Sequence, residues 1–587
     1  SMAKQWRINP HDASLVERLE QAAKLPPVVA QLLVGRGIYE AEEARAFIDA
    51  KLTGLRHPNE LPGVEAAVKL IFETIEAEKR IVIYGDYDAD GMTSTAILFR
   101  CLNLLKANVA YFIPNRLDDG YGLNDDALRK IASRGTALVI TVDCGIASVG
   151  QAKLAKELGL KLIITDHHEF ADELPDASVL VHPRLPGHNY PFGGLCGAGV
   201  ALKLAWALCQ RASGTEKVTD AMRNFLMMAV GISAIGTVCD VVPLVDENRL
   251  IVRHGLKSLF SNPPLGIDYL KKITKLDEKP ELSSEDIGFM LGPRLNAAGR
   301  LGQATLGVEL LTTDSHERAE ALAEYIHELN SSRDSLERSI YLAANKQAQE
   351  EFDPIGDPAL VLAGVGWHAG VIGIVAGRLA EKFNRPVVLI SLDQLDVKPG
   401  MGSARSACGL NLHQAFAACT DHLVSHGGHA AAAGLKIEAK NIDAFRADFN
   451  EHVAGEVTET DRVATLRIDA EAPLTQMTFR TVKQIEQLAP FGQHNPRPIL
   501  CTSGVELAEP PKKMGGGERH LSVKLKQFST TMRAVAFGQG EWADELEGVE
   551  GPIDIAYQPV INTYRGRNNV ELHLKDWRVS VSAKTLS

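Results

Sequence analysis

Residues 80–182 alternate short apolar runs with stretches of helical character, and this alternation restricts the fold more than any other feature. The apolar runs have the length of β-strands and lie at 80–85, 109–113, 137–142, 161–165 and 178–181. Residues 94–106 and 147–158, between these runs, are typical of helices. Strands that alternate with helices favour a parallel sheet. The sequence therefore predicts an α/β domain in this region.

A second α/β domain and a small barrel are predicted further along the chain. Strands at 360–362 and 386–390 flank a helix at 370–383. Residues 521–526 and 570–575 alternate apolar and polar side chains near turn-rich segments, which favours an antiparallel barrel. The 587 residues suffice for several domains. The predicted parts are a helical preface at 1–75, the first α/β domain at 76–313, a long connecting helix at 314–352, the second α/β domain at 353–456 and the barrel at 457–587.

The composition is that of an ordinary globular protein, with 45% hydrophobic and 23% charged residues. No uninterrupted apolar run approaches 18 residues, so we expect no membrane-spanning helix and no membrane contact. The eight cysteines include no Cys-x-x-Cys pair, which favours free thiols in a reducing cytoplasm over a disulfide framework or a zinc ribbon. The net charge of −12 does not exclude nucleic acid as a partner, because phosphate binding depends on local patches.

Acidic and histidine side chains directly follow three predicted strands of the first α/β domain, namely Asp86, Asp88, Asp90, Asp143, Asp166, His167 and His168. The carboxyl ends of parallel strands form the ligand crevice of an open sheet, so these side chains should converge. Clustered carboxylates repel one another and raise each other's pKa, and a divalent cation removes that conflict. Oxygen-rich ligands with one or two imidazoles suit Mn²⁺ or Mg²⁺.

Asp240 is a further candidate ligand, because a lone acid in the apolar segment 236–244 needs a partner or a metal if it is buried. Each signal also has a structural interpretation. The Asp-x-Asp-x-Asp run can form a solvated turn or cap a helix, the histidine pair can be structural, and Asp240 can be a salt-bridged core acid. Because three strand ends carry the same chemistry, the joint pattern favours a metal site.

These motifs resemble those of the DHH phosphoesterase superfamily and, within it, of the bacterial single-strand-specific exonucleases. In one-letter code they are YGDYDADGMTS at 84–94, VDCG at 142–145, TDHH at 165–168 and GTVCDVVP at 236–243. The GGH segment at 427–429 resembles the DHH-associated second domain. The segment LAPFGQHNP at 488–496 resembles the entry to the family's oligonucleotide-binding (OB) barrel. The resemblance covers essentially the whole chain.

The resemblance implies two divalent cations, preferably Mn²⁺ or else Mg²⁺, bridged by a carboxylate. It implies that Asp88 and Asp143 hold one ion. It implies that the bridge Asp143, together with Asp90, His167 and Asp240, holds the other.

Further roles follow from the same resemblance. Many relatives have a metal-binding histidine where this chain has Tyr84, and Asp86 is the candidate substitute. His168 is expected to face the scissile phosphate or the leaving oxygen. Asp166 is expected to orient a histidine as a hydrogen-bond acceptor.

The reaction implied by the resemblance is 5′ to 3′ hydrolysis of single-stranded DNA to nucleoside 5′-monophosphates in DNA repair and recombination. Two cations can clamp a phosphodiester and stabilise the leaving oxygen. Single-strand-binding protein and a helicase are the protein partners that the resemblance implies. Two alternatives stay open: a phosphodiesterase for short oligonucleotides or cyclic dinucleotides, whose relatives usually lack the barrel, and a non-catalytic DNA-binding scaffold.

Candidate phosphate contacts lie outside the metal motifs, at Arg116, Arg294, Asn296, Arg300, Ser403, Arg405 and His429. Arginine offers forked donors that suit phosphate oxygens, although each arginine can equally form a surface salt bridge. Ser403 and Arg405 lie in a glycine-rich loop, and we hypothesise that they bind a 5′-phosphate with Arg294 or Arg300 as a further donor. In the barrel, residues 512–533 carry six Lys/Arg and one acid, which is typical of a single-strand-binding groove, although Lys at alternating positions is also usual on a solvated strand face.

Overall fold

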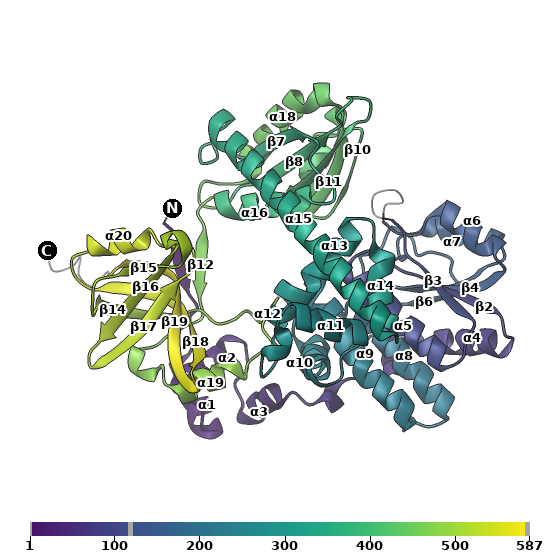
Figure 1. Cartoon of the computed structure of the whole chain (residues 1–587), viewed down its shortest axis with the longest axis horizontal. Coiled ribbons are helices and arrows are strands. Elements are labelled where there is room, and N and C mark those ends of the chain that lie inside the picture. Colours follow the sequence, from purple (N-terminus) through teal and green to yellow (C-terminus); the bar gives the residue numbers. More distant parts are fainter. Residues whose placement is uncertain (1–2, 116–120, 581–587) are drawn as a thin grey trace. The chain divides into compact units, whose positions relative to one another are not determined.

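The computed structural model describes residues 3–115 and 121–580 and divides the chain into two compact units. One unit combines the two ends of the chain, residues 1–51 and 464–587, and the other comprises residues 52–463. Figure 1 shows the larger unit as two α/β domains joined by a long helix. The smaller unit contains the strands coloured yellow and the purple helices of residues 13–49.

The first α/β domain contains the predicted parallel sheet, with strand order β3-β2-β4-β5-β6. Its strands are β2 (Arg80–Tyr84), β3 (Val109–Phe112), β4 (Thr136–Thr141), β5 (Lys161–Thr165) and β6 (Val179–Val181). Helices cover both faces of this sheet, namely α4 (Val64–Glu76), α5 (Ala89–Leu104) and α8 (Gly197–Ser213) on one face and α6 (Asp125–Ser133) and α7 (Val149–Glu157) on the other.

Alternation along the strands explains why both faces are apolar. Ile81 and Ile83 of β2 pack in the core with α4, α5 and α8, whereas Val82 and Tyr84 pack in the core with α6 and α7. Successive side chains of a strand point to opposite faces, so a strand buried on both sides is apolar throughout. This burial confirms the strands that were predicted from continuous apolar runs.

A helical layer completes the domain, with α9 (Asp220–Cys239), α10 (Asp246–Ser261), α11 (Leu265–Ile273), α12 (Ser284–Asp286), α13 (Gly292–Arg300) and α14 (Ala304–Thr312). Among the described residues, α9 alone is long and apolar enough to span a membrane by length and composition. Half of its most apolar window is buried inside the protein, and α9 packs against α5, α8 and α10. Core helices of globular domains meet the same two criteria, so α9 is weak evidence for a membrane span.

The predicted connecting helix is α15 (His316–Glu351), whose last turns pack on the second α/β domain. That domain has the strand order β10-β11-β9-β8-β7, in which only β7 and β8 are parallel neighbours. Its elements are β7 (Leu360–Val365), α16 (Ile372–Phe383), β8 (Val387–Leu392), β9 (Gly400–Arg405), α17 (Leu412–Ala418), β10 (Ser425–Gly428), β11 (Ala432–Ile437) and α18 (Ile442–Glu456).

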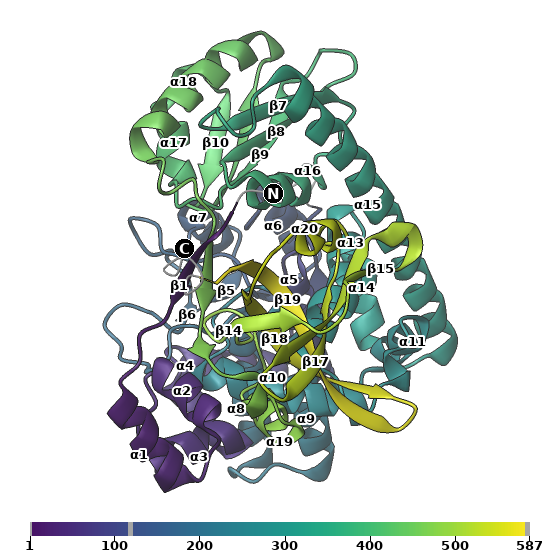
Figure 2. The same cartoon turned by 90° about the vertical axis from the view of Figure 1, so that its left-hand side faces the viewer.

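The barrel is a strongly curled sheet with the order β13-β14-β18-β19-β17-β16-β15 and one additional pairing between β14 and β16 (Figure 2). Leu521, Val523 and Leu525 of β16 are buried, whereas Lys524 and Lys526 are exposed, as the alternation predicts. The elements are β13 (Ala470–Glu471), α19 (Phe479–Glu486), β14 (Leu500–Leu507), β15 (Lys512–Met514), β16 (His520–Gln527), β17 (Thr530–Ala536), α20 (Trp542–Glu547), β18 (Ile553–Tyr564) and β19 (Arg567–Val579).

The N-terminal segment shares a core with this barrel. Its elements are β1 (Gln5–Ile8), which pairs in parallel with β12 (Thr465–Ile468), and the helices α1 (Ala13–Ala23), α2 (Pro27–Gly35) and α3 (Ala41–Asp49). Leu33 of α2 lies in the core that contains Leu521 of β16. Arg36 donates to Asn495 Oδ1 (2.9 Å) and to the carbonyl of Pro496 (3.0 Å). The structure thus divides the predicted preface, because residues 1–51 belong with the barrel and α4 belongs with the first α/β domain.

A fragment of residues 464–580 is expected to lack a cooperative unfolding transition, because it exposes the apolar surface that α2 covers. Joining residues 3–51 to that fragment through a flexible linker should restore a sharp thermal transition, measured by circular dichroism. A linked variant with Leu33→Asp serves as the matched control and should behave like the short fragment. Equal melting temperatures for the short and the linked fragments would contradict a shared core.

Candidate metal centre

The carboxyl ends of β2, β4 and β5 bring the predicted acidic and histidine side chains to one edge of the sheet. The strands are neighbours in register, with Tyr84 beside Thr141 and Thr141 beside Ile164, so the loops that follow start at the same level. Ligand atoms lie within 4.8 Å of one another in three overlapping groups: Asp86, Asp88 and Asp143; Asp90, His167 and Asp240; and Asp143, Asp166, His167 and His168. The predicted convergence is confirmed.

Asp88 and Asp90 lie at the start of α5. Asp88 caps this helix, because its Oδ1 accepts a hydrogen bond from Gly91 N (2.7 Å). The helix-capping interpretation and membership of the acidic cluster therefore hold together for this residue. Asp90 is buried, and its two oxygens accept from Gly197 N and Ala198 N in the first turn of α8, both at 2.8 Å. The helix dipole of α8 stabilises a negative charge at this point.

Two glycines allow the helices to approach these carboxylates. A Cβ on Gly197 would lie 2.6 Å from the Asp143 Cβ. A Cβ on Gly236 of α9 would lie 2.4 Å from Thr93 Oγ1 and 2.9 Å from Asp90 Oδ1. These distances are below the separation that a real Cβ tolerates, so these close approaches require glycine.

Asp143 occupies the centre of the cluster and belongs to two of its three groups. It is completely buried and adopts a positive φ of 59°. Its Oδ1 lies 3.0 Å from His167 Nε2, whereas its buried Oδ2 has no hydrogen-bond partner among the described residues. A buried carboxylate oxygen without a donor is costly unless a cation contacts it.

His167 faces three carboxylates through one ring nitrogen. Its Nε2 lies 3.0 Å from Asp143 Oδ1, 3.4 Å from Asp240 Oδ2 and 3.5 Å from Asp90 Oδ2. Burial lowers the pKa of His167 to about 4 in spite of these carboxylates. The neutral imidazole is the form that coordinates a metal.

His168 forms a separate pair with Asp166. Its Nδ1 lies 2.6 Å from Asp166 Oδ1 and 2.9 Å from Tyr121 Oη. Burial disfavours the charged ring, but the hydrogen bond and charge of Asp166 outweigh burial and raise the pKa of His168 to about 9. Asp166 also accepts from Ile146 N through Oδ2 (3.0 Å). Tyr121 was missed by the sequence analysis, because its only local signal is an aromatic residue in a loop after a strand.

Burial and, after it, mutual repulsion disfavour negative charge on the carboxylates of the centre. Burial and neighbouring carboxylates raise the pKa of Asp86, Asp88 and Asp143, and the same two causes raise the pKa of Asp240 to about 10. The donor set is rich in oxygen with one neutral imidazole, and one carboxylate oxygen lacks a partner among the described residues. These residues fit Mn²⁺ or Mg²⁺.

The structure shows where Tyr84 and its candidate substitute Asp86 lie relative to the cluster. Tyr84 is buried in the core, and its Oη donates to the carbonyl of Gly122 (3.2 Å), so its side chain is directed away from the cluster. Asp86 is buried in the cluster beside Asp88 and Asp143. Its Oδ1 accepts from Tyr87 N (2.8 Å). Asp86 is therefore available to a metal where the usual histidine is missing.

Asn248 of α10 links the two loops that position Asp90 and Asp240. Its buried Nδ2 donates to the carbonyls of Gly194 (2.7 Å) and Pro243 (2.9 Å). Gly194 precedes the first turn of α8, and Pro243 follows Asp240 in the chain. A single buried amide thus fixes the distance between these loops.

Two of the predicted phosphate contacts on α13 are engaged within the domain. Arg294 donates to the carbonyl of Met290 (2.7 Å) and lies 3.2 Å from His327 Nδ1. Asn296 Oδ1 accepts from Ala89 N (3.0 Å), which fixes the loop between Asp88 and Asp90.

Other predicted contacts gather at the start of α16. Arg300 Nη1 donates to the carbonyl of Gly370 (3.1 Å). Arg405 donates to Ser403 Oγ (3.1 Å), and a Cβ on Gly373 would lie 2.8 Å from Arg405 Nη2 and 2.9 Å from Ser403 Oγ. His429 lies in the exposed turn between β10 and β11. Arg116 lies outside the described residues.

Comparisons with known proteins match all three folded parts. Residues 80–232 match the DHH family N-terminal domain, residues 356–455 the DHHA1 domain, and residues 468–576 the RecJ OB domain. The single-stranded-DNA-specific exonuclease RecJ of Bacillus subtilis is 38% identical over 98% of this chain and 71% of its own length. The RecJ of Escherichia coli is 32% identical over 95% of this chain and 96% of its own length.

Solved structures give the same result. The crystal structure of RecJ in complex with Mn²⁺ from Thermus thermophilus superposes with a TM-score of 0.81 and 30% identity. The match covers 98% of this chain and 79% of that chain. The structure of the same protein with Mg²⁺ gives a TM-score of 0.74 at 29% identity, covering 98% of this chain and 78% of that one.

Binding of Mn²⁺ at pH 7 is expected to release protons, because raised pKa values keep part of the carboxylate cluster protonated at this pH. As the pH rises, fewer protons must leave, so the apparent affinity for Mn²⁺ should increase between pH 6 and 8. Calorimetric titrations in buffers with different ionisation enthalpies measure the number of protons released. Asp240→Asn should release fewer protons than the wild type, and the exposed Asp314→Asn should match the wild type. Tight binding without proton release would contradict the raised pKa values.

Proposed function

The chain belongs to the RecJ family of single-stranded-DNA-specific exonucleases, and we infer from this that it is itself such an exonuclease. It is a metal-dependent phosphodiester hydrolase, and its cofactors are divalent cations, Mn²⁺ or Mg²⁺. The observation that carries the proposal is the acidic cluster, which is complete within a chain that is 38% identical to a RecJ over 98% of its length. Single-stranded DNA is therefore the substrate.

We assign two ion positions within the cluster. Asp88 and Asp143, together with Asp86, would hold one ion, and Asp90, Asp143, His167 and Asp240 would hold the other. The central place of Asp143 in two ligand groups and its Oδ2, which lacks a partner among the described residues, support its role as the bridge. When bound, such a pair of cations supplies the positive charge that activates water and stabilises the leaving oxygen.

The chain's own residues supply orientation and a proton. Asp166 accepts a hydrogen bond from Nδ1 of His168 and raises the pKa of the imidazole, so the His168 ring is charged at neutral pH. His168 Nε2–H is then the atom that can donate to the phosphate or to the leaving oxygen. Asp166 acts as the orienting acceptor, and four hydrogen bonds, from the His168 ring and from the backbone of Ile146, His167 and His168, hold it in place.

The proposed direction is 5′ to 3′, with nucleoside 5′-monophosphates as products. Support comes from the group at the start of α16, where Ser403 and Arg405 lie on the same face of β9. The first amides of a helix and a forked guanidinium together suit a phosphate that carries more charge than an internal diester. Arg300 reaches the segment just before this helix and is the better candidate for a third donor than Arg294, which bonds His327 and the Met290 carbonyl.

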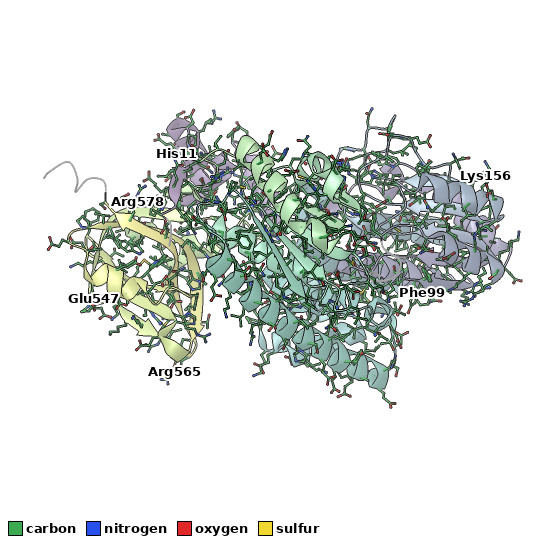
Figure 3. All side chains as sticks on the ribbon, turned by 90° about the horizontal axis from the view of Figure 1, so that it is seen from above. His11, Phe99, Lys156, Glu547, Arg565 and Arg578 are labelled. Carbon is green, nitrogen blue, oxygen red and sulfur yellow. The ribbon has the colours of Figure 1, made fainter. Side chains whose placement is uncertain are left out.

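The barrel is proposed to hold the single strand beyond the reactive centre. Lys524 and Arg533 are cross-strand neighbours on its exposed face. On the same sheet the ring of Phe537 packs edge-on against His520 and His573, with ring centres 5.5 and 5.2 Å away. The β18–β19 hairpin ends in a turn with Arg565 (Figure 3). Cationic side chains interleaved with rings bind single strands with little sequence preference.

The two alternatives are less well supported. A short-oligonucleotide or cyclic-dinucleotide phosphodiesterase has no use for the matched RecJ OB domain at 468–576. A non-catalytic scaffold has no reason to keep every ligand of the cluster in place. We further propose a cytoplasmic role in DNA repair and recombination, with single-strand-binding protein and a helicase as partners. The eight free cysteines agree with a reducing compartment.

Digestion of end-labelled DNA tests the function directly. With Mn²⁺ or Mg²⁺, single-stranded DNA should be degraded from its 5′ end to mononucleotides, whereas duplex DNA and reactions with a chelator should remain intact. Asp143→Asn should lower turnover by at least about a thousandfold, because this change weakens both ion sites, while the far-ultraviolet circular dichroism stays unchanged. Asp314→Asn is the control and should retain full activity. Degradation of dinucleotides but not of long strands would instead support the phosphodiesterase alternative.

The 5′-phosphate site predicts a dependence on the chemistry of the end. Arg405→Ala should lower kcat/KM on 5′-phosphorylated strands by about 10- to 100-fold, the effect of losing one charged hydrogen bond. Strands with a 5′-hydroxyl should be affected much less. Arg405→Lys keeps the charge without the fork and should give an intermediate loss. Equal losses on both ends would make Arg405 a general backbone contact.

A further inference from the structure

The helix α13 and the π-helix before it, Ile287–Leu291, form a wall beside the metal centre. Asn296 accepts from the amide of Ala89, and a Cβ on Gly299 would lie 1.9 Å from the carbonyl of Tyr87. A Cβ on Gly292 would lie 2.5 Å from the Sγ of Cys239, the neighbour of Asp240. The wall thus touches both the loop that carries Asp88 and the loop that carries Asp240.

The π-helix presents two apolar side chains to solvent. Ile287 and Leu291 are completely buried in the core and anchor this turn. Phe289 is 75% exposed and Met290 is 37% exposed. The guanidinium of Arg294 donates a hydrogen bond to the Met290 carbonyl, which ties this turn to α13. Single π-helical turns are rare and frequently occur at functional sites, because they re-aim side chains.

Val241, directly after Asp240, shows a second unusual feature. It has a positive φ of 59° and is 61% exposed. A β-branched residue is strained in this region of backbone conformation, and such strain is often retained at functional sites. A Cβ on Gly288 would lie 3.8 Å from Val238 Cγ1, so the π-helix packs on the end of α9 that leads to Val241.

Val241, Phe289 and Met290 define what we call the apolar shelf. We propose that this shelf binds a nucleobase of the DNA strand, with Phe289 as the stacking residue, within a few nucleotides of the scissile phosphate. This inference rests on the proposed function. The acidic centre, through its cations, recognises only phosphate oxygens, so the base beside it requires an apolar support. Val241 directly follows the proposed ligand Asp240, and the turn that carries Phe289 and Met290 packs on the same end of α9.

Stacking on an aromatic ring accepts every base, because each base has a π face. The shelf therefore improves binding without adding sequence preference, as an exonuclease that proceeds along any strand requires. A strand that remains paired cannot lay a single base flat on Phe289, so the shelf also favours unpaired DNA. Both consequences follow from geometry at the centre itself and are independent of the barrel.

The test combines Phe289→Ala with strands that lack one base. On intact single strands, Phe289→Ala should lower kcat/KM by about 5- to 150-fold, the range for losing one base–aromatic stack. Abasic sites are placed singly at each of the first six positions from the 5′ end. An abasic site at the stacked position should lower kcat/KM of the wild type. The same abasic site should leave kcat/KM of Phe289→Ala at its value on the intact strand. Phe289→Tyr should retain the wild-type values.

Controls separate stacking from structural damage. Phe289→Ala should keep the wild-type melting temperature and the wild-type calorimetric affinity for Mn²⁺. Phe260→Ala on α10 removes another exposed ring and should leave kcat/KM unchanged. Unchanged kcat/KM in Phe289→Ala, or an equal loss at every abasic position, would overturn the shelf while leaving the exonuclease assignment intact. If the wild type degrades no single strand at all, the proposed function itself fails.

Discussion

Repulsion among buried carboxylates is the constraint on which the larger unit depends. Asp86, Asp90 and Asp143 are buried together at one edge of a parallel sheet, and burial together with neighbouring carboxylates raises the pKa of Asp86 and of Asp143. Such an arrangement is unfavourable by itself, and cations offset it. The helices around the cluster offset part of this unfavourable free energy. The first turn of α8 donates two amides to Asp90, and the small residues Gly197 and Gly236 allow the helices to reach the acids.

The sequence predicted those features of the fold and the centre that are local. Continuous apolar runs identified the five strands of the first sheet, and the acids that follow them had to converge because parallel neighbours end together. Contacts between distant segments escaped prediction. No pattern near Asp90 shows that its carboxylate is held by amides 107 and 108 residues later in the chain. The bond between Tyr121 and His168 likewise depends on how two loops fold.

The type of a residue indicates what its side chain can bind, but it does not predict which way that side chain points. Arg294 and Asn296 were selected as polar groups suited to phosphate in a segment that contains glycine, and the structure directs them towards His327 and the Ala89 amide. Ser403 and Arg405 were selected for the same reason and lie together at the start of α16. Alternate side chains of a strand always lie on the same face of the sheet. The side chains of a helix point in several directions and can contact different neighbours. The sequence therefore predicted which side chains lie together on β9 but not where those of α13 point.

The shared core of the two chain ends has a consequence for synthesis on the ribosome. Residues 1–51 emerge before the larger unit, but the barrel that covers α2 starts only after residue 463. At about 5–20 residues per second, the nascent helices wait for tens of seconds with their apolar surface uncovered. The larger unit, which lies between them in sequence, can fold completely during that interval. Although these helices are made well before the barrel, they are thus among the last parts of the described chain to reach their native contacts, and their apolar surface is open to a chaperone until then.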